Sequence, residues 1–344
     1  MKAVRLFGVN DVRVVDVDRP VPKPGEVLVK VAAAGVCHSD LHLIEHGRRA
    51  QKQPFTLGHE NAGWVEQLGD GVDGFEIGEP VMVFGPWGCG HCAPCQASFE
   101  NYCEHQSESP VLGGGLGTDG GMAEYMIVPH PRLLVKLGDL APGEVAPLSD
   151  AALTPYHAIK RSAAKLTPSS FVFVIGIGGL GHMAVQILKK LYAATVIAGD
   201  IADDKLDVAR HHGADHVVRT DRPDAAEQIR ALTGSKKCAV VLDFVGAAPT
   251  LALGAATVGL NGDFTVVGLA GGHIDYAAGV VPWGASLCVP YWGSRVELME
   301  VLDMKRKGII DIDYTTYPLE RANDVYQMLR EGRINGRAVL VPSH

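Results

Sequence analysis

The pattern of apolar and polar residues changes character near residue 146. Before that point, short apolar runs at 27–36, 62–69 and 80–86 are separated by turn-forming segments rich in Gly and Pro. Runs of this kind predict strands, and long amphipathic helices are scarce in this part of the chain. We therefore expect an irregular, mostly antiparallel β domain here.

From residue 171 onward, apolar runs alternate with amphipathic helical segments. In chain order, strands and helices are predicted at 171–176, 182–191, 194–200, 203–213, 216–218, 224–234, 239–246, 250–259 and 264–270. Repeated βα alternation is typical of a doubly wound parallel sheet. The tail adds a helix at 296–308 and a strand at 337–342, which is too little for a third domain. We expect it to pack on the first domain.

Composition fits a globular protein with two domains. A chain of 344 residues is too long for a single domain of ordinary size. Its 47% hydrophobic and 20% charged residues are typical of a globular protein. A net charge of −8 argues against nucleic acid or an anionic membrane as partner. The N-terminus lacks the apolar run of a signal peptide, and no apolar stretch reaches the ~18–20 residues of a membrane span. We expect a cytoplasmic protein with reduced thiols.

A glycine-rich segment joins the strand at 171–176 to the following helix. It supplies the predicted cofactor-binding residues Gly176, Gly178, Gly179, Leu180 and Gly181. In a G-x-G-x-x-G segment the glycines allow a tight turn, the approach of a pyrophosphate and close helix–strand packing. The next apolar strand ends at Asp200, nineteen residues after Gly181. A carboxylate there accepts from ribose hydroxyls and repels a 2′-phosphate, which predicts NAD rather than NADP.

Residues 89–103 contain four of the chain's seven cysteines, in two overlapping C-x₂-C pairs and a closing position: Cys89, Cys92, Cys95 and Cys103. Such pairs are typical of zinc sites, and four thiolates leave no open position, which predicts a structural ion. In a ferredoxin-type iron–sulfur site the fourth cysteine follows after about three residues and precedes proline. Here seven residues intervene and Glu104 follows, which disfavours that alternative. His91, inside the loop, is expected to be an exposed residue and not a ligand.

A second candidate set is spread more widely along the chain. Cys37 and His59 offer a thiolate and an imidazole, both suited to zinc, and each lies in a β-like segment. A lone Cys or His is more often a core or surface residue. The pair needs a third ligand, and the spacing alone does not say which acid provides it.

Together these residues resemble the zinc-dependent medium-chain alcohol dehydrogenases. The segments CHSD at 37–40, GHE at 58–60, the four-cysteine loop and GIGGLG occur in that family's order and spacing over essentially the whole chain. The segments at 85–89, 153–158 and 290–293 are most similar to bacterial NAD-dependent secondary-alcohol dehydrogenases. The resemblance implies a GroES-like catalytic domain at 1–148 and 293–344, and a Rossmann NAD-binding domain at 149–292.

The resemblance also implies two zinc ions per chain, one structural and one catalytic. The catalytic ion would be held by Cys37, His59 and Asp150, where many relatives place a cysteine instead of the aspartate. Glu60 would lie beside it as a transient ligand, and Asp40 would orient a ligand histidine. The metal would lower the pKa of the alcohol, Ser39 would take its proton, and the cofactor ribose would pass that proton to His42 for release to solvent.

Further cofactor contacts are carried over from the family. His38 and Arg337 are expected near the pyrophosphate, Lys205 near the adenosine ribose, and Thr154 and the backbone of Val267 to Leu269 at the nicotinamide. Leu269 and Trp292 are expected in the substrate pocket, although Trp292 is equally suited to interface packing.

The implied activity is reversible hydride transfer between NAD and a small primary or, in preference, secondary alcohol. A polyol dehydrogenase or another carbonyl reductase of the family is the alternative. Two other classes are disfavoured. Zinc-free quinone reductases on the same scaffold typically lack the Cys/His pair and the cysteine loop. A non-catalytic protein that only binds the cofactor would not need the candidate ligand and proton-relay residues. A homodimer or homotetramer is expected, and the strand-like stretch at 285–293 could pair across a dimer.

Overall fold

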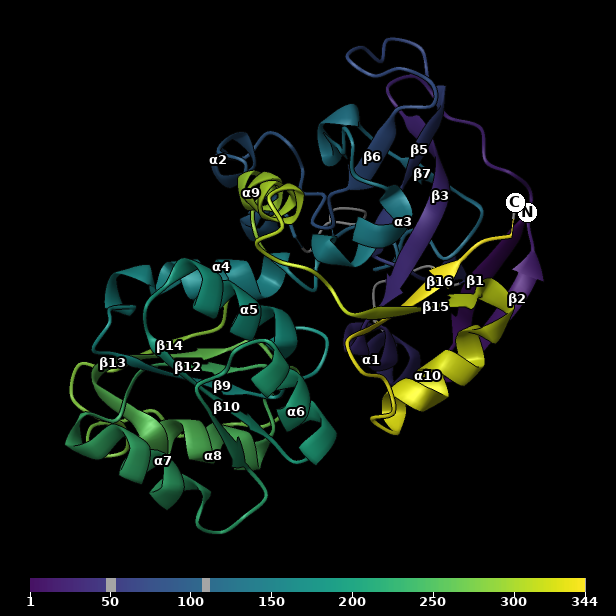
Figure 1. The fold of residues 1–344 in the computed structure, drawn as a ribbon. Helices are drawn as coiled ribbons and strands as arrows, with labels where there is room; N and C mark the ends of the chain where they lie inside the picture. The colour runs from purple at the N-terminus through teal and green to yellow at the C-terminus, as the bar shows by residue number, and fades with distance from the viewer. Residues whose placement is uncertain (48–53, 107–111, 344) are drawn as a thin grey trace. The chain divides into compact units, whose positions relative to one another are not determined.

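The computed structural model describes residues 1–47, 54–106 and 112–343 (Figure 1). The chain folds into two compact units. The first comprises Met1–Leu153, Gly293–Arg306 and Ile312–His344, and the second comprises Thr154–Trp292 and Lys307–Asp311. The boundary expected at residues 148 and 149 thus lies slightly earlier than the division in the structure, and the tail contributes a short segment to the second unit.

Short strands dominate the first unit. They are β1 (Lys2–Gly8), β2 (Asp11–Asp16), β3 (Val27–Val36), β4 (Phe55–Thr56), β5 (Glu60–Leu68), β6 (Pro80–Val83), β7 (Tyr125–Val128), β8 (Leu134–Lys136), β15 (Tyr314–Pro318) and β16 (Arg337–Val341). One sheet has the order β2-β1-β4, and the other has the order β15-β16-β3-β5-β6-β8, with β7 paired to β3. All of these pairings are antiparallel except that of β15 with β16.

The centre of the larger sheet positions the candidate metal residues. β3 and β5 pair antiparallel, with Gly35 opposite Glu60. The C-terminal strand β16 lies on the other side of β3, with Ala338 opposite Val36. The tail therefore completes the sheet of the first unit beside residue 37.

Helices and 3₁₀ turns connect the strands of the first unit. They are α1 (His38–His46), α2 (Ala93–Gln96), α3 (Pro142–Val145), α9 (Arg295–Arg306) and α10 (Ala322–Arg330), with 3₁₀ turns η1 (Glu100–Tyr102), η2 (Pro131–Leu133), η3 (Ala146–Ser149) and η6 (Leu319–Arg321). The expectation that residue 37 lies within a β-like segment holds only up to Val36, because α1 begins at His38. Asp40 in its first turn accepts from the Cys37 amide at 3.0 Å, which satisfies a donor at the helix start.

The second unit has a six-stranded, fully parallel sheet in the order β11-β10-β9-β12-β13-β14. The strands are β9 (Phe171–Ile175), β10 (Thr195–Asp200), β11 (His216–Arg219), β12 (Cys238–Asp243), β13 (Val258–Val266) and β14 (Ser286–Cys288). This is the strand order of a dinucleotide-binding sheet: the chain adds strands in one direction from β9 to β11, and then in the other direction from β12 to β14. The prediction of an α/β protein with an irregular β domain and a doubly wound sheet is confirmed.

Helices alternate with these strands: α4 (Leu153–Arg161), α5 (Gly181–Leu191), α6 (Asp203–His211), α7 (Ala225–Thr233) and α8 (Ala248–Thr257), with 3₁₀ turns η4 (Ala163–Lys165) and η5 (Gly234–Lys236). In Figure 1, α5 lies on one side of the sheet and α7 and α8 lie on the other. Phe173, Ile197 and Val241 of the sheet belong to a buried core that also contains Ile229 of α7 and Leu251 of α8. Within the described residues, no helix is long and apolar enough to cross a membrane.

Candidate metal and cofactor sites

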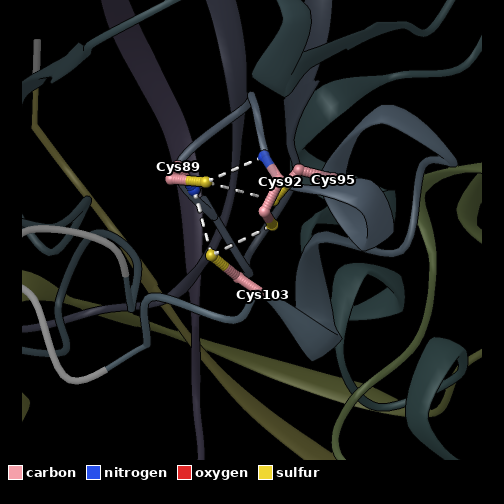
Figure 2. Close-up of side chains that lie close together, drawn as sticks. All are labelled: Cys89, Cys92, Cys95 and Cys103. Atoms are coloured by element: carbon pink, nitrogen blue, oxygen red, sulfur yellow. Dashed lines mark hydrogen bonds between the residues drawn. The ribbon is translucent and has the colours of Figure 1, made fainter.

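Four cysteine side chains converge in the loop after β6 (Figure 2). The sulfurs of Cys89, Cys92, Cys95 and Cys103 all lie within 4.8 Å of one another. The Sγ atoms of Cys89 and Cys95 are 3.9 Å apart, as are those of Cys92 and Cys103, and all four are free thiols. A tetrahedral zinc with bonds of about 2.3 Å sets its sulfurs about 3.8 Å apart. The donor set therefore fits a closed zinc site.

Backbone amides point at these sulfurs. The Cys89 amide donates to Cys103 Sγ at 3.3 Å, and the Cys92 amide donates to Cys89 Sγ at 3.4 Å. Burial works against ionisation of Cys89, but N–H donors from His91 and Cys92 outweigh it and lower the pKa of Cys89 to about 6. Burial raises the pKa of Cys95 to about 12. The loop thus favours a first thiolate at Cys89, and thiolate is the form that binds metal.

A buried carboxylate ties this loop to α9. Glu100 is only 2% exposed, and its Oε1 lies 3.3 Å from Arg132 Nη1 and 3.5 Å from Arg295 Nε. Arg132 also donates to the carbonyls of Trp87 and Gly88, both at 2.9 Å. A buried charge needs such partners, so removing either arginine would leave Glu100 under-compensated.

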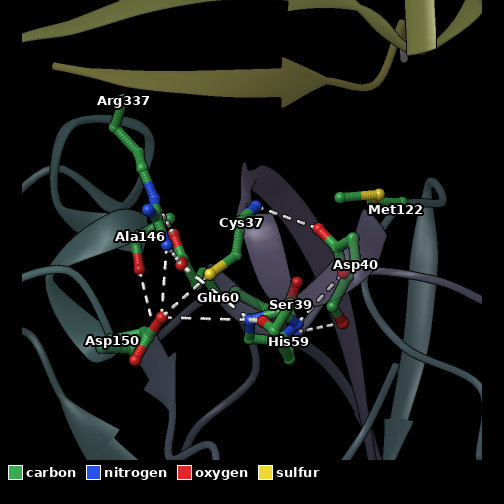
Figure 3. A network of polar contacts seen from close by, with 12 residues as sticks. Cys37, Ser39, Asp40, His59, Glu60, Met122, Ala146, Asp150 and Arg337 are labelled. Carbon is green, nitrogen blue, oxygen red and sulfur yellow. Dashed lines mark hydrogen bonds and ion pairs between the residues drawn. The ribbon is translucent and has the colours of Figure 1, made fainter. Parts of the chain in front are cut away.

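A second cluster lies at the end of β3 and the start of β5 (Figure 3). Cys37, His59, Glu60 and Asp150 are buried, and one ligand atom of each lies within 4.8 Å of the others. Cys37 Sγ is 3.4 Å from Asp150 Oδ2, and His59 Nε2 is 4.0 Å from the same oxygen. Asp150 comes from the end of η3, far along the chain from the two strands. The structure thus brings the predicted thiol, imidazole and carboxylate together.

Asp40 sets the orientation of His59. His59 Nδ1 faces Asp40 Oδ1 at 3.2 Å, which leaves Nε2 directed at the cluster. Burial lowers the pKa of His59, but Asp40 and the Cys37 thiol outweigh it and hold that pKa well above its ordinary value. The hydroxyl of Ser39 lies 3.2 Å from Nε2. Ser39 is therefore adjacent to the atom that would bind a metal.

Arg337 points into this cluster. Its Nε donates to Glu60 Oε2 at 3.0 Å, its Nη2 contacts Glu60 Oε1, and Nη2 donates to Asp150 Oδ2 at 3.2 Å. Burial raises the pKa of Glu60, whereas the charge of Arg337 lowers it. Because Asp150 raises it further, the pKa of Glu60 is about 7. The guanidinium is 3% exposed and occupied by two carboxylates, so the expected contact with a pyrophosphate stays a prediction.

The other histidines of this segment lie on α1. His38 at the start of the helix is exposed, and His42 one turn later is half-buried. The ring of His42 stacks toward that of His46, with centroids 6.4 Å apart. His42 thus lies between the buried helix face and solvent, a position that suits release of a proton.

In the second unit, the glycine-rich segment follows β9 as predicted. Gly176 has a φ of 87°, which only glycine adopts without strain. A Cβ at Gly181 would collide with the carbonyl of Gly176, whereas nothing lies near Gly178. Gly178 and Gly179 are partly exposed, and Leu180 precedes the first residue of α5. Helix start and open backbone together form a cradle for an anionic group.

Asp200 closes this cradle from β10. Its Oδ2 accepts from the Ile177 amide at 2.7 Å, and its Oδ1 accepts from the amides of Ile201 and Ala202 at 2.7 and 3.1 Å. Because its Oδ2 holds the Ile177 amide, Asp200 has a second task that the sequence did not reveal: it holds the glycine-rich turn.

Lys205 on α6 is 8% exposed, and burial lowers its pKa although Asp204 and Asp200 oppose the change.

The residues expected at the nicotinamide lie on separate elements. Thr154 is buried in the first turn of α4. Val267 follows β13 and is half-buried, and Leu269 is 62% exposed. Trp292 is 6% exposed, and its place in the substrate pocket stays a prediction.

Comparison with known proteins identifies the family. Residues 23–139 match the family model described as alcohol dehydrogenase GroES-like domain, and residues 179–304 match the one described as zinc-binding dehydrogenase. An NAD-dependent alcohol dehydrogenase of Sulfurisphaera tokodaii is 36% identical over 99% of this chain and 100% of its own length. The chain belongs to the zinc-binding medium-chain alcohol dehydrogenases.

Solved structures of this alcohol dehydrogenase family agree with the fold. The alcohol dehydrogenase of Aeropyrum pernix superposes with a TM-score of 0.92 at 37% identity, covering 99% of this chain and 100% of that chain. An acetophenone reductase of Geotrichum candidum, solved in complex with NAD, gives a TM-score of 0.87 at 32% identity over 99% and 96% of the two chains.

Two residues of this alcohol dehydrogenase were missed by the sequence reasoning. The ring Nδ1 of buried His182 lies 3.0 Å from the Gly178 carbonyl, which also accepts the His182 amide. A carbonyl only accepts, so Nδ1 carries the proton and the ring holds the glycine-rich turn. The only available signal was the position of His182 directly after Gly181.

The second missed residue is Asp243, at the end of β12. Its Oδ1 accepts from the amides of Val245 and Gly246 at 2.8 and 3.0 Å. Its carbonyl accepts from the amides of Val267 and Gly268 at 2.8 and 3.1 Å. One buried aspartate thus links the loop after β12 to the loop predicted to hold the nicotinamide. An acid ending an apolar strand was its only sequence signal.

Proposed function

We propose that this protein oxidises a small secondary or primary alcohol with NAD, reversibly, at a zinc ion held by Cys37, His59 and Asp150. The observation that carries this proposal is the convergence of a buried thiol, imidazole and carboxylate. A tetrahedral zinc spaces its S, N and O ligands about 3.3–3.5 Å apart, close to the 3.4 Å from Cys37 Sγ to Asp150 Oδ2. Three protein ligands leave one position for substrate.

The residues around this site have separate tasks. When bound, zinc supplies a Lewis acid that lowers the pKa of an alcohol hydroxyl, and NAD supplies the hydride acceptor. Asp40 holds His59 in the tautomer that presents Nε2, as such carboxylates do for ligand histidines. Ser39, 3.2 Å from that nitrogen, would take the proton of the alcohol and give up its own hydroxyl proton toward the cofactor ribose, from which His42 would release it to solvent.

Glu60 and Arg337 balance the charge of the site. The carboxylates of Glu60 and Asp150 share one guanidinium, so Arg337 offsets part of their negative charge. Glu60 is proposed to exchange between Arg337 and the metal when ligands enter or leave. The same exchange would free the guanidinium for the cofactor's pyrophosphate.

Zinc removal tests the proposed function directly. Dialysis against a chelator is expected to abolish NADH formation, and restored zinc is expected to recover it. Full activity after complete loss of metal would overturn the mechanism.

A panel of primary alcohols, secondary alcohols, polyols and sugars, each assayed with NAD, identifies the substrate class. We expect secondary alcohols to give the highest kcat/KM. A preference for polyols would favour the alternative, a polyol dehydrogenase.

The two tasks of Asp200 can be separated by changing it to asparagine. Loss of its charge is expected to weaken the binding of NAD at least about tenfold. It should also raise the affinity for NADP relative to that for NAD, because repulsion of a 2′-phosphate disappears. Loss of its grip on Ile177 would weaken both cofactors equally. Equilibrium dissociation constants for NAD and NADP measure this directly. An unchanged ratio would remove the role of Asp200 in cofactor choice.

We propose two zinc ions per chain, the second held by the four cysteines, and a homodimer or homotetramer as the assembly. Exposed apolar side chains on the second unit support this assembly, since Leu260 and Trp283 line one recess and are 73% and 75% exposed. A monomer in light scattering would contradict this proposed assembly.

We also propose a cytoplasmic location, because cysteines that are not joined in disulfides and are proposed to bind zinc suit a reducing compartment. Cell fractionation tests this location.

A further inference from the structure

We propose that Cys89, His91 and His105 form an outer site for a borderline transition-metal ion, beside the four-cysteine site and sharing the sulfur of Cys89 with it. One ligand atom of each residue lies within 4.8 Å of the other two. The rings of His91 and His105 face each other with centroids 5.4 Å apart and planes inclined by 39°. This set is separate from the ligands proposed for catalysis.

Cys89 differs from its three companions in exposure. Cys92, Cys95 and Cys103 are buried, whereas Cys89 is half-buried, His91 is exposed and His105 is half-buried. The sulfur that two sites would share is therefore the one nearest to solvent. A thiolate has several lone pairs, so binding one ion inside the loop leaves it able to bind a second outside.

The imidazole of His91 makes a backbone contact that is common among metal-binding histidines. Its Nδ1 lies 3.2 Å from the carbonyl of Cys89. Because a carbonyl only accepts, Nδ1 donates here, and in the neutral ring the other nitrogen keeps a lone pair. Metal-binding histidines commonly donate their second N–H to a backbone carbonyl in this way. The contact thus fixes the ring beside Cys89.

The local charge does not oppose a cation. Arg132 packs beneath Gly90, but its guanidinium is paired with buried Glu100 at 3.3 Å and donates to two carbonyls. Two imidazoles and a thiolate favour Zn²⁺, Ni²⁺, Co²⁺ or Cu²⁺ over Mg²⁺ or Ca²⁺. Three ligands near solvent leave open positions for water, so this ion should bind more weakly than one held by four sulfurs.

Equilibrium dialysis of the zinc-loaded full chain against Ni²⁺ tests the outer site. The wild type is expected to bind nickel with no release of zinc and to show a sulfur-to-nickel charge-transfer band. His91→Gln and His105→Gln should each weaken this binding at least about tenfold and remove the band. His46→Gln is the matched control, because it removes a histidine from the separate pair on α1, and the band should persist.

Three results would overturn the outer site: no charge-transfer band, a band unaffected by either glutamine variant, or nickel that enters only as zinc leaves. Zinc content and turnover without nickel are measured on the same samples. These values test the proposed function separately, so a failure of the outer site is distinguishable from a failure of catalysis.

Discussion

Cys37→Ser is expected to lower kcat/KM for alcohol oxidation at least about a thousandfold, equivalent to about 4 kcal/mol of transition-state stabilisation. The thiolate is a strong zinc ligand and a hydroxyl is a poor one, so the catalytic ion would be lost or displaced. Cys37 is 7% exposed, and serine has nearly its shape. The fold should survive, with zinc falling from two to one per chain and little change in Tm.

Cys288→Ser provides the matched control. Cys288 is a free, half-buried thiol on β14, outside both candidate metal clusters. This variant should keep its zinc and its kcat/KM. A Cys37→Ser protein with wild-type activity and two zinc ions would show that Cys37 is not a ligand. An unfolded Cys37→Ser protein would instead assign the residue a structural task.

Cys92→Ser is expected to have the opposite profile. Losing the ion of the four-cysteine loop removes binding energy that also holds the loop folded. A loss of about 3 kcal/mol would lower the Tm by about 6–12 °C in a domain of this size. Calorimetry measures this change, and zinc analysis should give one ion per chain. The protein that remains folded should keep most of its kcat.

The comparison of the two serine variants assigns the two sites. A stable but inactive Cys92→Ser protein would mean that the structural and catalytic roles are exchanged. A Cys92→Ser protein with unchanged Tm and full zinc content would exclude metal binding by the loop. Both variants lose one thiol, so the difference between them reports position and not chemistry.

Local features of the site could be read from the sequence, and distant ones could not. The four cysteines lie within fifteen residues, so their spacing alone indicates that they gather around one ion. Asp150 is 113 residues away from Cys37, and only the family resemblance pointed to it. The contacts of Arg337 with Glu60 and Asp150 depend on the pairing of β16 with β3. Spacing along a chain carries no information on such pairings.

The fold was predictable in outline because strands and helices of the second unit follow clear hydrophobic periods. Helix α1 was not, since His38 to His46 begins with polar residues and lacks an apolar stripe long enough to separate it from the preceding strand. Its start depends instead on Asp40, which accepts from the Cys37 amide. His182 and Asp243 were missed for a related reason: a single polar residue gives no pattern.

The pairing of β3 with β5 has a consequence for how this protein can diverge. Cys37 follows one strand directly and His59 precedes the other, and Gly35 lies opposite Glu60. A Cβ at Gly35 would collide with the Glu60 side chain. The distance between the two proposed ligands is thus set by backbone hydrogen bonds, and most side chains can drift over evolutionary time without altering it. A single-residue insertion in either strand would separate thiol from imidazole at once.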